Sequence, residues 1–564
     1  MKKALNPGLY WTNYFENDEG QKIYNRKELN KLVTDYYSKL YADDATTNSE
    51  LAEIENMEEE PYFLEREIET IINQLKPDKS PGHDGITNEH IKAGGRKLIT
   101  LLTKLFNRIL KTGTIPTEWK RSNIIILHKK GDRHKIGNYR PITLSLTIAK
   151  IFSKLIETRI QKLLIEHQPI EQAGFRKTFS TIDHLQSINQ IIEKSTEYQI
   201  TLYIALIDYN KAFDSLKHQF MLRALKNQGI PEKLVRIIEE LYRGLKARIM
   251  TDEEGEYFEI NKGVKQGDPL SPILFNSSLE EIFRNLNWEE KGLDVNGKKL
   301  TNLRFADDVI LFANSEEELT VMINELSQQS VTAGLTMNAK KTKILTNKTN
   351  QKTITINGNK IDITEDATYL GQTISFTNRT DKEVNTRVTK AWAKYWSLRN
   401  IFKGPFNIYH KCQIFNMCII PTLTYGCQTW TLKKNILEKI RVTQNAMERS
   451  MLNVRIKDKI RIEKIKRKLK FNEDAIRYVR RQKWGWAGHI TRLNDDRWTY
   501  LTTFWQPRNG KRRRGKQKKR WKEDFENFLR HKTFDRIAQN RKEWERLQET
   551  FALYGPENLW HGSR

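Results

Sequence analysis

The stretch Phe305-Ala306-Asp307-Asp308 lies between two short apolar runs, Leu303 to Phe305 and Val309 to Phe312. Runs of this kind are typical of β-strands, so the sequence predicts a hairpin that holds two adjacent carboxylates at its turn. Neighbouring carboxylates repel one another, and burial penalises their charged forms further. A divalent cation would remove that cost. The alternative is an ordinary solvated turn, in which Asp is a common residue.

A third carboxylate follows the apolar and β-branched run from Thr201 to Asn210. This run predicts a buried strand that delivers Asp208 at its carboxyl end, where open α/β sheets place ligands. Together with Asp307 and Asp308, it forms an oxygen ligand set of the kind that suits Mg²⁺. In two-metal phosphoryl transfer, ions roughly 4 Å apart activate a 3′-hydroxyl and stabilise the leaving pyrophosphate. These carboxylates therefore predict nucleotide addition.

Composition points to a folded protein that attracts polyanions. The 564 residues predict two to four domains, and 38% hydrophobic residues are enough for folded cores. The net charge of +27 makes nucleic acid the leading partner. We expect no membrane association, because no uninterrupted apolar stretch approaches about 18 residues. The three cysteines, Cys412, Cys418 and Cys427, fit neither a disulfide framework nor a zinc site, as expected of an intracellular protein.

Ten short blocks occur along the chain in a specific order. They are Lys79 to Ile86, Gly113 to Trp119, Lys129 to Asp132, Asn138 to Ile142, Gln172 to Arg176, Asp208 to Asp214, Gly263 to Pro272, Phe305 to Asp308, Gly334 to Lys343 and Tyr369 to Gly371. In this order they resemble the reverse transcriptase of a non-LTR (LINE-type) retrotransposon, from about Lys76 to about Trp430. The resemblance implies an RNA-directed DNA polymerase that adds deoxynucleotides to a primer 3′-hydroxyl.

The resemblance also implies an α+β, right-hand polymerase fold with a mostly helical, basic C-terminal extension. The expected domains are an N-terminal helical leader or linker (1–60), fingers and palm with an antiparallel sheet (61–376), a helical thumb or connector (377–430) and a basic, Trp-rich nucleic-acid-binding region (431–564). About sixty leading residues cannot fold the endonuclease that such proteins commonly carry. We therefore expect the polymerase portion of a second open reading frame product.

Catalytic roles can be carried over to matched positions. Asp208 and Asp307 resemble the principal metal ligands and Asp308 the weaker third one, holding two Mg²⁺ ions for which Mn²⁺ could substitute. Lys341 resembles the lysine that protonates the leaving pyrophosphate, although Lys340 and Lys343 lie beside it. The alternative for the carboxylates is a purely structural role.

The nucleotide site is expected from further blocks. Phe213 resembles the aromatic gate that excludes a ribose 2′-hydroxyl, and its alternative is a core Phe. Gln266 and Gly267 resemble residues beside the nascent base pair, before a helix that we expect to be capped by Ser271. Arg140 and Lys129 resemble the triphosphate contacts of the fingers, since guanidinium suits bidentate phosphate binding. Their alternative is a solvated basic face.

Two further regions are expected to contact nucleic acid. Tyr369, Leu370 and Gly371 resemble the primer grip, although a simple hairpin turn would have the same pattern. From Arg477 to Trp521 aromatic residues and cations alternate, and stacking on bases with phosphate neutralisation is one interpretation. The candidate cations are Arg512, Arg513, Arg514, Lys518, Lys519 and Arg520. The alternative is a small Trp core beside a nuclear-localisation-like run, which fits action in nucleus and cytoplasm.

The expected partners are template RNA, primer or target DNA and deoxynucleoside triphosphates. Two other functions stay open at this point: a non-catalytic RNA- or DNA-binding protein derived from such an element, and a mobile-intron maturase-like reverse transcriptase. The intact Asp208, Asp307 and Asp308 argue against the first alternative. The sequence assigns no oligomeric state.

Overall fold

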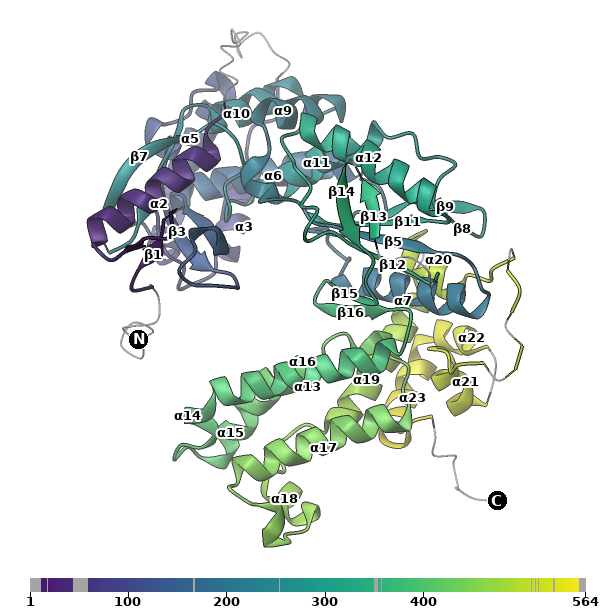
Figure 1. Ribbon diagram of the computed structural model, residues 1–564. Helices are drawn as coiled ribbons and strands as arrows, with labels where there is room; N and C mark the ends of the chain where they lie inside the picture. Colours follow the sequence, from purple (N-terminus) through teal and green to yellow (C-terminus); the bar gives the residue numbers. More distant parts are fainter. Residues whose placement is uncertain are drawn as a thin grey trace. The chain divides into compact units, whose positions relative to one another are not determined.

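The computed structural model describes residues 12–17, 19–43, 59–165, 168–252, 254–348, 353–356, 358–493, 495–508, 510–512, 514–515, 517–530 and 533–556 (Figure 1). The chain folds into two compact units, each built from three segments. The first unit comprises Met1–Pro169, Tyr209–Asn287 and Glu325–Asn338, and the second comprises Ile170–Asp208, Trp288–Asn324 and Ala339–Arg564.

The first unit contains a four-stranded sheet in the order β4-β3-β6-β7. Its strands are β3 (Arg121–His128), β4 (Tyr139–Leu144), β6 (Leu245–Met250) and β7 (Glu254–Ile260). β3 pairs antiparallel with β4 and parallel with β6, and β6 pairs antiparallel with β7. The strand predicted over 123–128 is part of β3, where Ile124 and Ile126 are buried at the two-residue spacing of a pleated strand.

The first unit also contains helices. They are α2 (Arg26–Tyr41), α3 (Glu65–Gln74), α4 (Asn88–Ala93), α5 (Gly95–Thr112), α6 (Thr147–Ile165), α8 (Ala212–Ser215), α9 (His218–Asn227), α10 (Glu232–Tyr242) and α11 (Ser271–Arg284), beside the short hairpin β1 (Phe15–Glu16) and β2 (Lys22–Ile23). The Asn25 side chain caps α2 by accepting from two backbone amides of its first turn. α2 packs against β7, so the described part of the predicted leader belongs to the first unit.

The second unit contains the antiparallel sheet β10-β11-β5-β12. Its strands are β5 (Tyr203–Ile207), β10 (Asn302–Phe305), β11 (Asp308–Ala313) and β12 (Lys343–Thr346). All five residues of β5 are buried, which confirms the buried strand predicted within 201–210. The predicted hairpin is the pair β10 and β11. Three further hairpins are β8 (Leu293–Val295) with β9 (Lys298–Leu300), β13 (Thr353–Ile356) with β14 (Asn359–Asp362), and β15 (Asp366–Tyr369) with β16 (Gln372–Ser375).

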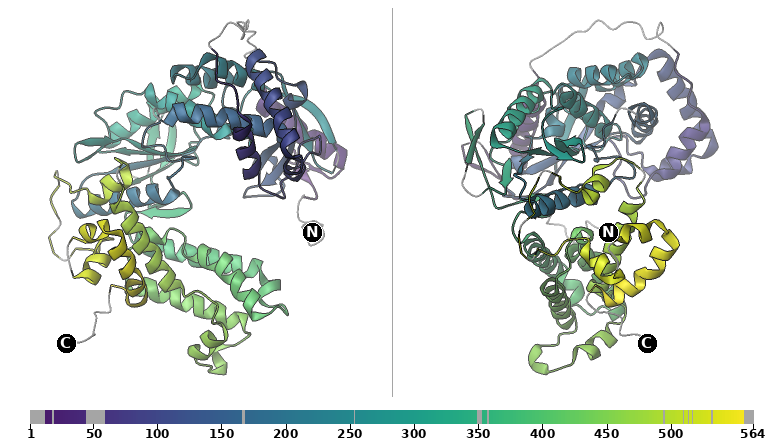
Figure 2. Two further views of the ribbon diagram at one scale, coloured as in Figure 1. Left: turned by 180° about the vertical axis from the view of Figure 1, so that it is seen from behind. Right: turned by 90° about the vertical axis from the view of Figure 1, so that its right-hand side faces the viewer.

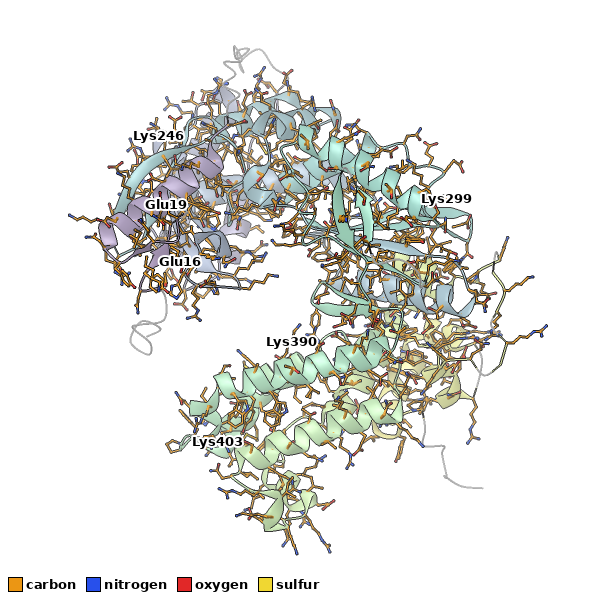
Figure 3. All side chains as sticks on the ribbon, viewed as in Figure 1. Glu16, Glu19, Lys246, Lys299, Lys390 and Lys403 are labelled. Atoms are coloured by element: carbon orange, nitrogen blue, oxygen red, sulfur yellow. The ribbon has the colours of Figure 1, made fainter. Side chains whose placement is uncertain are left out.

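The rest of the second unit is helical. Its helices are α7 (Thr181–Glu197), α13 (Arg379–Ser397), α14 (Arg399–Phe402), α15 (Ile408–Ile414), α16 (Ile420–Leu423), α17 (Lys434–Met451), α18 (Ile462–Lys468), α19 (Ala475–Thr491), α20 (Trp498–Phe504), α21 (Glu523–Leu529), α22 (Phe534–Gln539) and α23 (Arg541–Tyr554). α12 (Glu316–Thr332) begins in the second unit and ends in the first. A π-helical turn joins α15 to α16. Lys403, labelled in Figure 3, donates to Asn453 Oδ1 at 2.9 Å and so ties the end of α14 to the segment after α17.

The C-terminal helices gather into one cluster, drawn in yellow in Figure 2. The rings of Trp484 and Trp544 stack there at 3.8 Å between centroids, and Trp521 is fully buried in the same core. Trp498 and Trp505 pack instead with the β5 sheet. These five indoles are core residues, as one of the two sequence interpretations expected, and are not available to stack on bases. The predicted α+β fold class with a mostly helical C-terminal extension is confirmed.

Among the described helices, none combines the length and the apolar composition needed to cross a membrane.

Candidate active site

The β10–β11 hairpin presents its carboxylates through a two-residue turn. Phe305 pairs with Asp308, so Ala306 and Asp307 form the turn, and Ala306 has a φ of 57° as primed hairpin turns require. β11 also pairs with β5, with Val309 opposite Ile207. The next residues in this antiparallel register are Asp308 and Asp208. The three predicted carboxylates therefore lie at one edge of one sheet.

Gln172 braces this turn. Its Oε1 accepts hydrogen bonds from the amides of Ala306 at 3.1 Å and Gly174 at 2.8 Å, and the residue is only 2% exposed. A Cβ at Gly174 would lie 2.3 Å from the Ala306 nitrogen, so only glycine allows this approach. Neither residue has a predicted role, although both lie in the block from Gln172 to Arg176 that carries the family resemblance. That block was the available signal.

One carboxylate oxygen of Asp208 accepts no hydrogen bond. Its Oδ1 atom is buried without a hydrogen-bond partner, and the Lys341 ammonium lies 3.7 Å away. Among the residues that the structure describes, no three His, Cys, Asp or Glu side chains stand together as a preformed metal-binding group. Carboxylate oxygens are nevertheless the donors that Mg²⁺ prefers, and the Asp208 Oδ1 atom accepts no hydrogen bond that a metal ion would have to displace. The residues present fit a divalent cation by their chemistry.

The lysines after α12 differ in their surroundings. Lys341 is 60% exposed in its side chain and lies beside Asp208, whereas Lys343 Nζ lies 3.4 Å from Asp362 Oδ2. This difference favours Lys341 over Lys343 for the predicted proton donor.

The predicted primer grip forms the turn of the β15–β16 hairpin. Tyr369 pairs with Gln372, and Leu370 and Gly371 between them have φ values of 45° and 79°. The buried Tyr369 hydroxyl lies 3.2 Å from His184 Nδ1. Burial raises the pKa of Tyr369 well above its usual value, and the charge of Asp308 raises it further. Burial also lowers the pKa of His184 to about 3, so this imidazole is neutral at physiological pH.

Helix α13 clamps the same turn. Arg387 donates to the Gly371 carbonyl and forms an ion pair with Glu383, with only 6% and 1% of their side chains exposed. Glu383 Oε2 accepts from the Thr373 amide at 2.6 Å. The Tyr425 hydroxyl donates to the Leu370 carbonyl at 2.8 Å, and the Arg387 guanidinium lies 4.8 Å from the centroid of the Tyr425 ring. The turn is therefore fixed from two sides.

In the first unit, Phe213 and Gln266 are held by neighbours that sequence analysis did not single out. The half-buried Phe213 ring stacks on Phe275 at 4.4 Å. Gln266 Nε2 donates to Asp214 Oδ1 at 2.8 Å, and the Tyr41 hydroxyl of α2 donates to the same oxygen at 3.0 Å. Burial raises the pKa of Asp214 to about 6, although these two hydrogen bonds oppose the shift. Asp214 therefore fixes the Gln266 amide.

The backbone at position 267 favours glycine. It has a φ of 112°, and a Cβ there would lie 3.2 Å from the Thr143 carbonyl oxygen. The expected cap of α11 is wrong by one residue: the N-cap is Leu270, and Ser271 Oγ donates to the Lys265 carbonyl at 2.7 Å. The physical reason is that the Asp268 carboxylate accepts a hydrogen bond from the Leu270 amide at 3.0 Å. It therefore supplies the side-chain acceptor before the helix that was expected from Ser271.

The predicted triphosphate contacts are exposed in the first unit. Arg140 lies on β4, and its charge acts to lower the pKa of Asp214. Lys129 follows β3, and its amide donates to the Asn138 carbonyl at 2.9 Å.

Several of the predicted tail cations form internal ion pairs. Arg512 and Arg520 each lie 2.6 Å from Glu197 Oε1, and Lys519 lies 2.7 Å from Asp524 Oδ1. Arg514 and Lys518 are exposed. Arg513 lies outside the described residues.

Comparisons with known proteins agree with this geometry. Residues 127–374 match the family model described as reverse transcriptase (RNA-dependent DNA polymerase). A transposon-derived protein of Caenorhabditis elegans is 33% identical over 267 residues, which cover 44% of this chain and 95% of that protein. The Pol polyprotein from the type-2 retrotransposable element R2DM of Drosophila melanogaster is 29% identical over 53% of this chain. The chain spans 28% of that polyprotein's length.

A solved structure of telomerase from Candida tropicalis, in complex with a fragment of telomeric RNA, is 13% identical with a TM-score of 0.37. That similarity covers 69% of this chain and 65% of the telomerase chain, and the score is too low to support a conclusion. The family model, the two transposon relatives and the carboxylate hairpin agree with one another. This chain belongs to the reverse transcriptases of non-LTR retrotransposons, a family of RNA-directed DNA polymerases and hence of nucleotidyltransferases.

Proposed function

We propose that this chain extends a primer 3′-hydroxyl with deoxynucleotides on an RNA template by two-metal phosphoryl transfer, and that a DNA template also serves. The observation that carries the proposal is the pairing of Val309 with Ile207, because Asp308 and Asp208 are the next residues of the two strands and Asp307 lies in the adjoining turn. Its partners would be template RNA, primer or target DNA and deoxynucleoside triphosphates. We place its action inside the cell, in nucleus and cytoplasm.

Reverse transcriptases as a family use divalent metal ions. In this chain Asp208 and Asp307 would hold two Mg²⁺ ions, or Mn²⁺ as a substitute, with Asp308 as the third carboxylate. When bound, such ions lower the pKa of the attacking hydroxyl and neutralise charge on the leaving pyrophosphate. Lys341 lies beside Asp208 and would give its proton to that pyrophosphate.

The first unit would select the nucleotide. The Phe213 ring is fixed by Phe275, so it would clash with a ribose 2′-hydroxyl instead of moving aside. Gln266 and Gly267 would contact the nascent base pair, with the Gln266 amide oriented by Asp214. Arg140 and Lys129 would contact the triphosphate, because both are exposed cations.

The second unit would hold the primer and template. Tyr369, Leu370 and Gly371 would grip the primer end, and their turn is immobilised by α13. Lys390, labelled in Figure 3, projects from α13 and is available to a phosphate of the duplex. In the tail, Arg514 and Lys518 are exposed for nucleic acid, whereas Arg512, Lys519 and Arg520 would have to share their carboxylate partners.

The test is primer extension on a defined RNA template with Mg²⁺ and deoxynucleotides, comparing the wild type with Asp307→Asn. Asp362→Asn is the matched control, because Asp362 lies on β14 with 65% of its side chain exposed. We expect extension by the wild type and the control, no extension by Asp307→Asn, and equal template binding by all three. Full extension by Asp307→Asn would refute the assigned role. Template binding without extension by the wild type would favour the non-catalytic alternative.

A further inference from the structure

The segment from Arg455 to Lys470 is strongly basic, and we name it the basic lobe. Its sixteen residues include nine Lys and Arg, namely Arg455, Lys457, Lys459, Arg461, Lys464, Lys466, Arg467, Lys468 and Lys470. Its two acidic residues are Asp458 and Glu463, so the lobe carries a net +7 of the chain's +27. It lies within the region 431–564 that the sequence predicts to bind nucleic acid, outside the stretch from Arg477 to Trp521 where the candidate contacts were expected. In Figure 1 its helix α18 lies beyond the end of α17.

The lobe is anchored to the core of the second unit. Ile465 and Leu469, four residues apart on α18 and at its C-cap, are 1% and 2% exposed and belong to the apolar core that includes α17. Arg449 of α17 donates to the Ile460 carbonyl at 3.0 Å. Lys466 lies 3.2 Å from Asp474, the N-cap of α19. The backbone that carries the cations is therefore held in place, which lowers the entropy lost when a ligand binds.

Three cations of α18 are displayed to solvent. Lys464, Arg467 and Lys468 are exposed, and their spacing of three and four residues places them on one face of the helix. Within the part of the chain that the structure describes, no carboxylate lies within 4.0 Å of their charged nitrogen atoms. This differs from Arg512 and Arg520 of the tail, which share Glu197. A polyanion can bind these three cations without breaking an ion pair.

We propose that the basic lobe binds the sugar-phosphate backbone of nucleic acid independently of sequence. Phosphate is the complementary group, because the lobe presents point charges and guanidinium groups with few acidic residues among them. The lobe contains no aromatic residue, so stacking on bases contributes nothing. The inference deepens the proposed function, on which it rests for its choice of nucleic acid as the polyanion.

The experiment uses the full chain and the triple variant Lys464→Ala, Arg467→Ala, Lys468→Ala. Affinity for a duplex and for a single-stranded RNA is measured by fluorescence anisotropy over a series of salt concentrations. Each phosphate contact contributes about 0.9 to the slope of log K against log salt for duplex DNA and about 0.7 for single strands. We expect the slope to fall by about 2 to 3 on a DNA duplex and by about 2 on the single strand.

The matched control removes three cations from α23, with Arg541→Ala, Lys542→Ala and Arg546→Ala. Acidic residues lie among these cations on the same helix, namely Glu543, Glu545 and Glu549. Arg541 lies 2.8 Å from Glu545. The control makes the same change in net charge, and we expect it to leave the slope almost unchanged. Equal falls in the two triple variants would overturn the proposal, because net charge alone would then explain the binding.

A gain variant tests the same surface without removing a cation from it. Glu463→Lys adds a cation to the first turn of α18, and we expect it to raise the slope by about 1. An unchanged slope in Glu463→Lys and in the triple variant would overturn the proposal. Binding of the wild type to vesicles with 30% phosphatidylserine, lost in the triple variant while its nucleic-acid slope stays unchanged, would assign the lobe to a membrane surface instead.

Primer extension separates this inference from the proposed function. With a short primer-template at saturating concentration, we expect kcat of the triple variant to match the wild type, since the lobe supplies no catalytic group. A wild type that binds with the expected slopes but does not extend would remove the proposed function and leave the lobe as a binding surface. If the wild type extends the primer and the triple variant shows no change in slope, the proposed function stands and the basic lobe is not a binding surface.

Discussion

At the scale of single residues, the site depends on polar side chains buried behind the groups that react. Asp214 is one of them: its carboxylate orients Gln266, and burial raises its pKa to about 6, above the value of about 4 in an unfolded chain. The folded state therefore favours the protonated form. The stability that this group contributes is present below about pH 4 and is lost as the pH rises through about 6.

Replacing Asp214 by Asn should remove this pH dependence and retain an oxygen that accepts from Tyr41 and Gln266. Between pH 4 and pH 7 the free energy of unfolding of the wild type should fall by roughly 2–3 kcal/mol relative to Asp214→Asn, because a pKa shift of about two units has that magnitude. Denaturant unfolding at several pH values measures the difference. Parallel profiles for the two proteins would show that Asp214 does not titrate in this range.

The brace behind the carboxylate turn gives a second prediction. Gln172→Ala leaves the amides of Ala306 and Gly174 without their acceptor, at a cost of about 1–3 kcal/mol for each unpaired group. Gly174→Ala forces the turn away by a clash with Ala306. Both variants should lower kcat for extension and leave primer-template affinity unchanged, as measured by single-turnover extension and anisotropy. Gly485→Ala, whose new Cβ meets nothing within 4 Å, is the control and should retain wild-type kcat.

At the scale of elements, the clamp between α13 and the β15–β16 turn links a helix to the primer grip. Arg387→Lys keeps the charge and loses the fork that reaches both Glu383 and the Gly371 carbonyl. We expect the KM for primer-template to rise about tenfold, as the loss of about 1.4 kcal/mol predicts, with little change in the KM for deoxynucleotides. Steady-state extension with each substrate varied in turn measures both constants. An equal rise in the two constants would mean that Arg387 supports the fold in general.

Sequence patterns predicted the elements whose signals are local. The apolar run of β5 and the Asp-Asp turn between β10 and β11 each lie within about ten residues. The contacts that hold the site were not predictable in this way. Contacts join Gly371, Arg387 and Tyr425, which span more than fifty residues of the chain. No local periodicity in the sequence predicts such contacts.

The sequence left two interpretations of the tail open for the same physical reason. A Trp beside cations can stack on a base or enter a core, and only its partner decides between them. The partner of Trp484 is Trp544, sixty residues further along the chain. The cap of α11 was missed because the competing acceptor, the Asp268 carboxylate, lies before the helix.

At the scale of the whole molecule, a buried ion pair joins three parts of the second unit. Lys483 of α19 and Asp524 of α21 pair with no side-chain exposure, Lys483 donates to the Trp430 carbonyl at 2.7 Å, and Asp524 accepts from the Leu432 amide at 2.9 Å. The C-terminal helices are thus tied to the segment between α16 and α17. Loss of this pair should loosen that whole region.

Asp524→Asn leaves Lys483 buried without a counter-charge, and we expect a loss of about 3–5 kcal/mol in the free energy of unfolding. The double variant Lys483→Met, Asp524→Leu should lose less, because it removes both fully buried charges and leaves only the partly exposed Lys519 without its carboxylate partner. Thermal unfolding and limited proteolysis measure the effect. A double variant as unstable as Asp524→Asn would show that the hydrogen bonds to the backbone, and not the charges, hold this region.

In the proposed function, the end of β5 and the β10–β11 turn form one divalent-ion centre. The most direct measurement is hydroxyl-radical cleavage of the polypeptide by Fe²⁺ bound in place of Mg²⁺, with the fragments located by mass spectrometry. We expect cuts next to Asp208 and next to Asp307 and Asp308, both suppressed by excess Mg²⁺ and by Asp208→Asn. Cuts at only one of the two segments, or cuts that persist in Asp208→Asn, would contradict it.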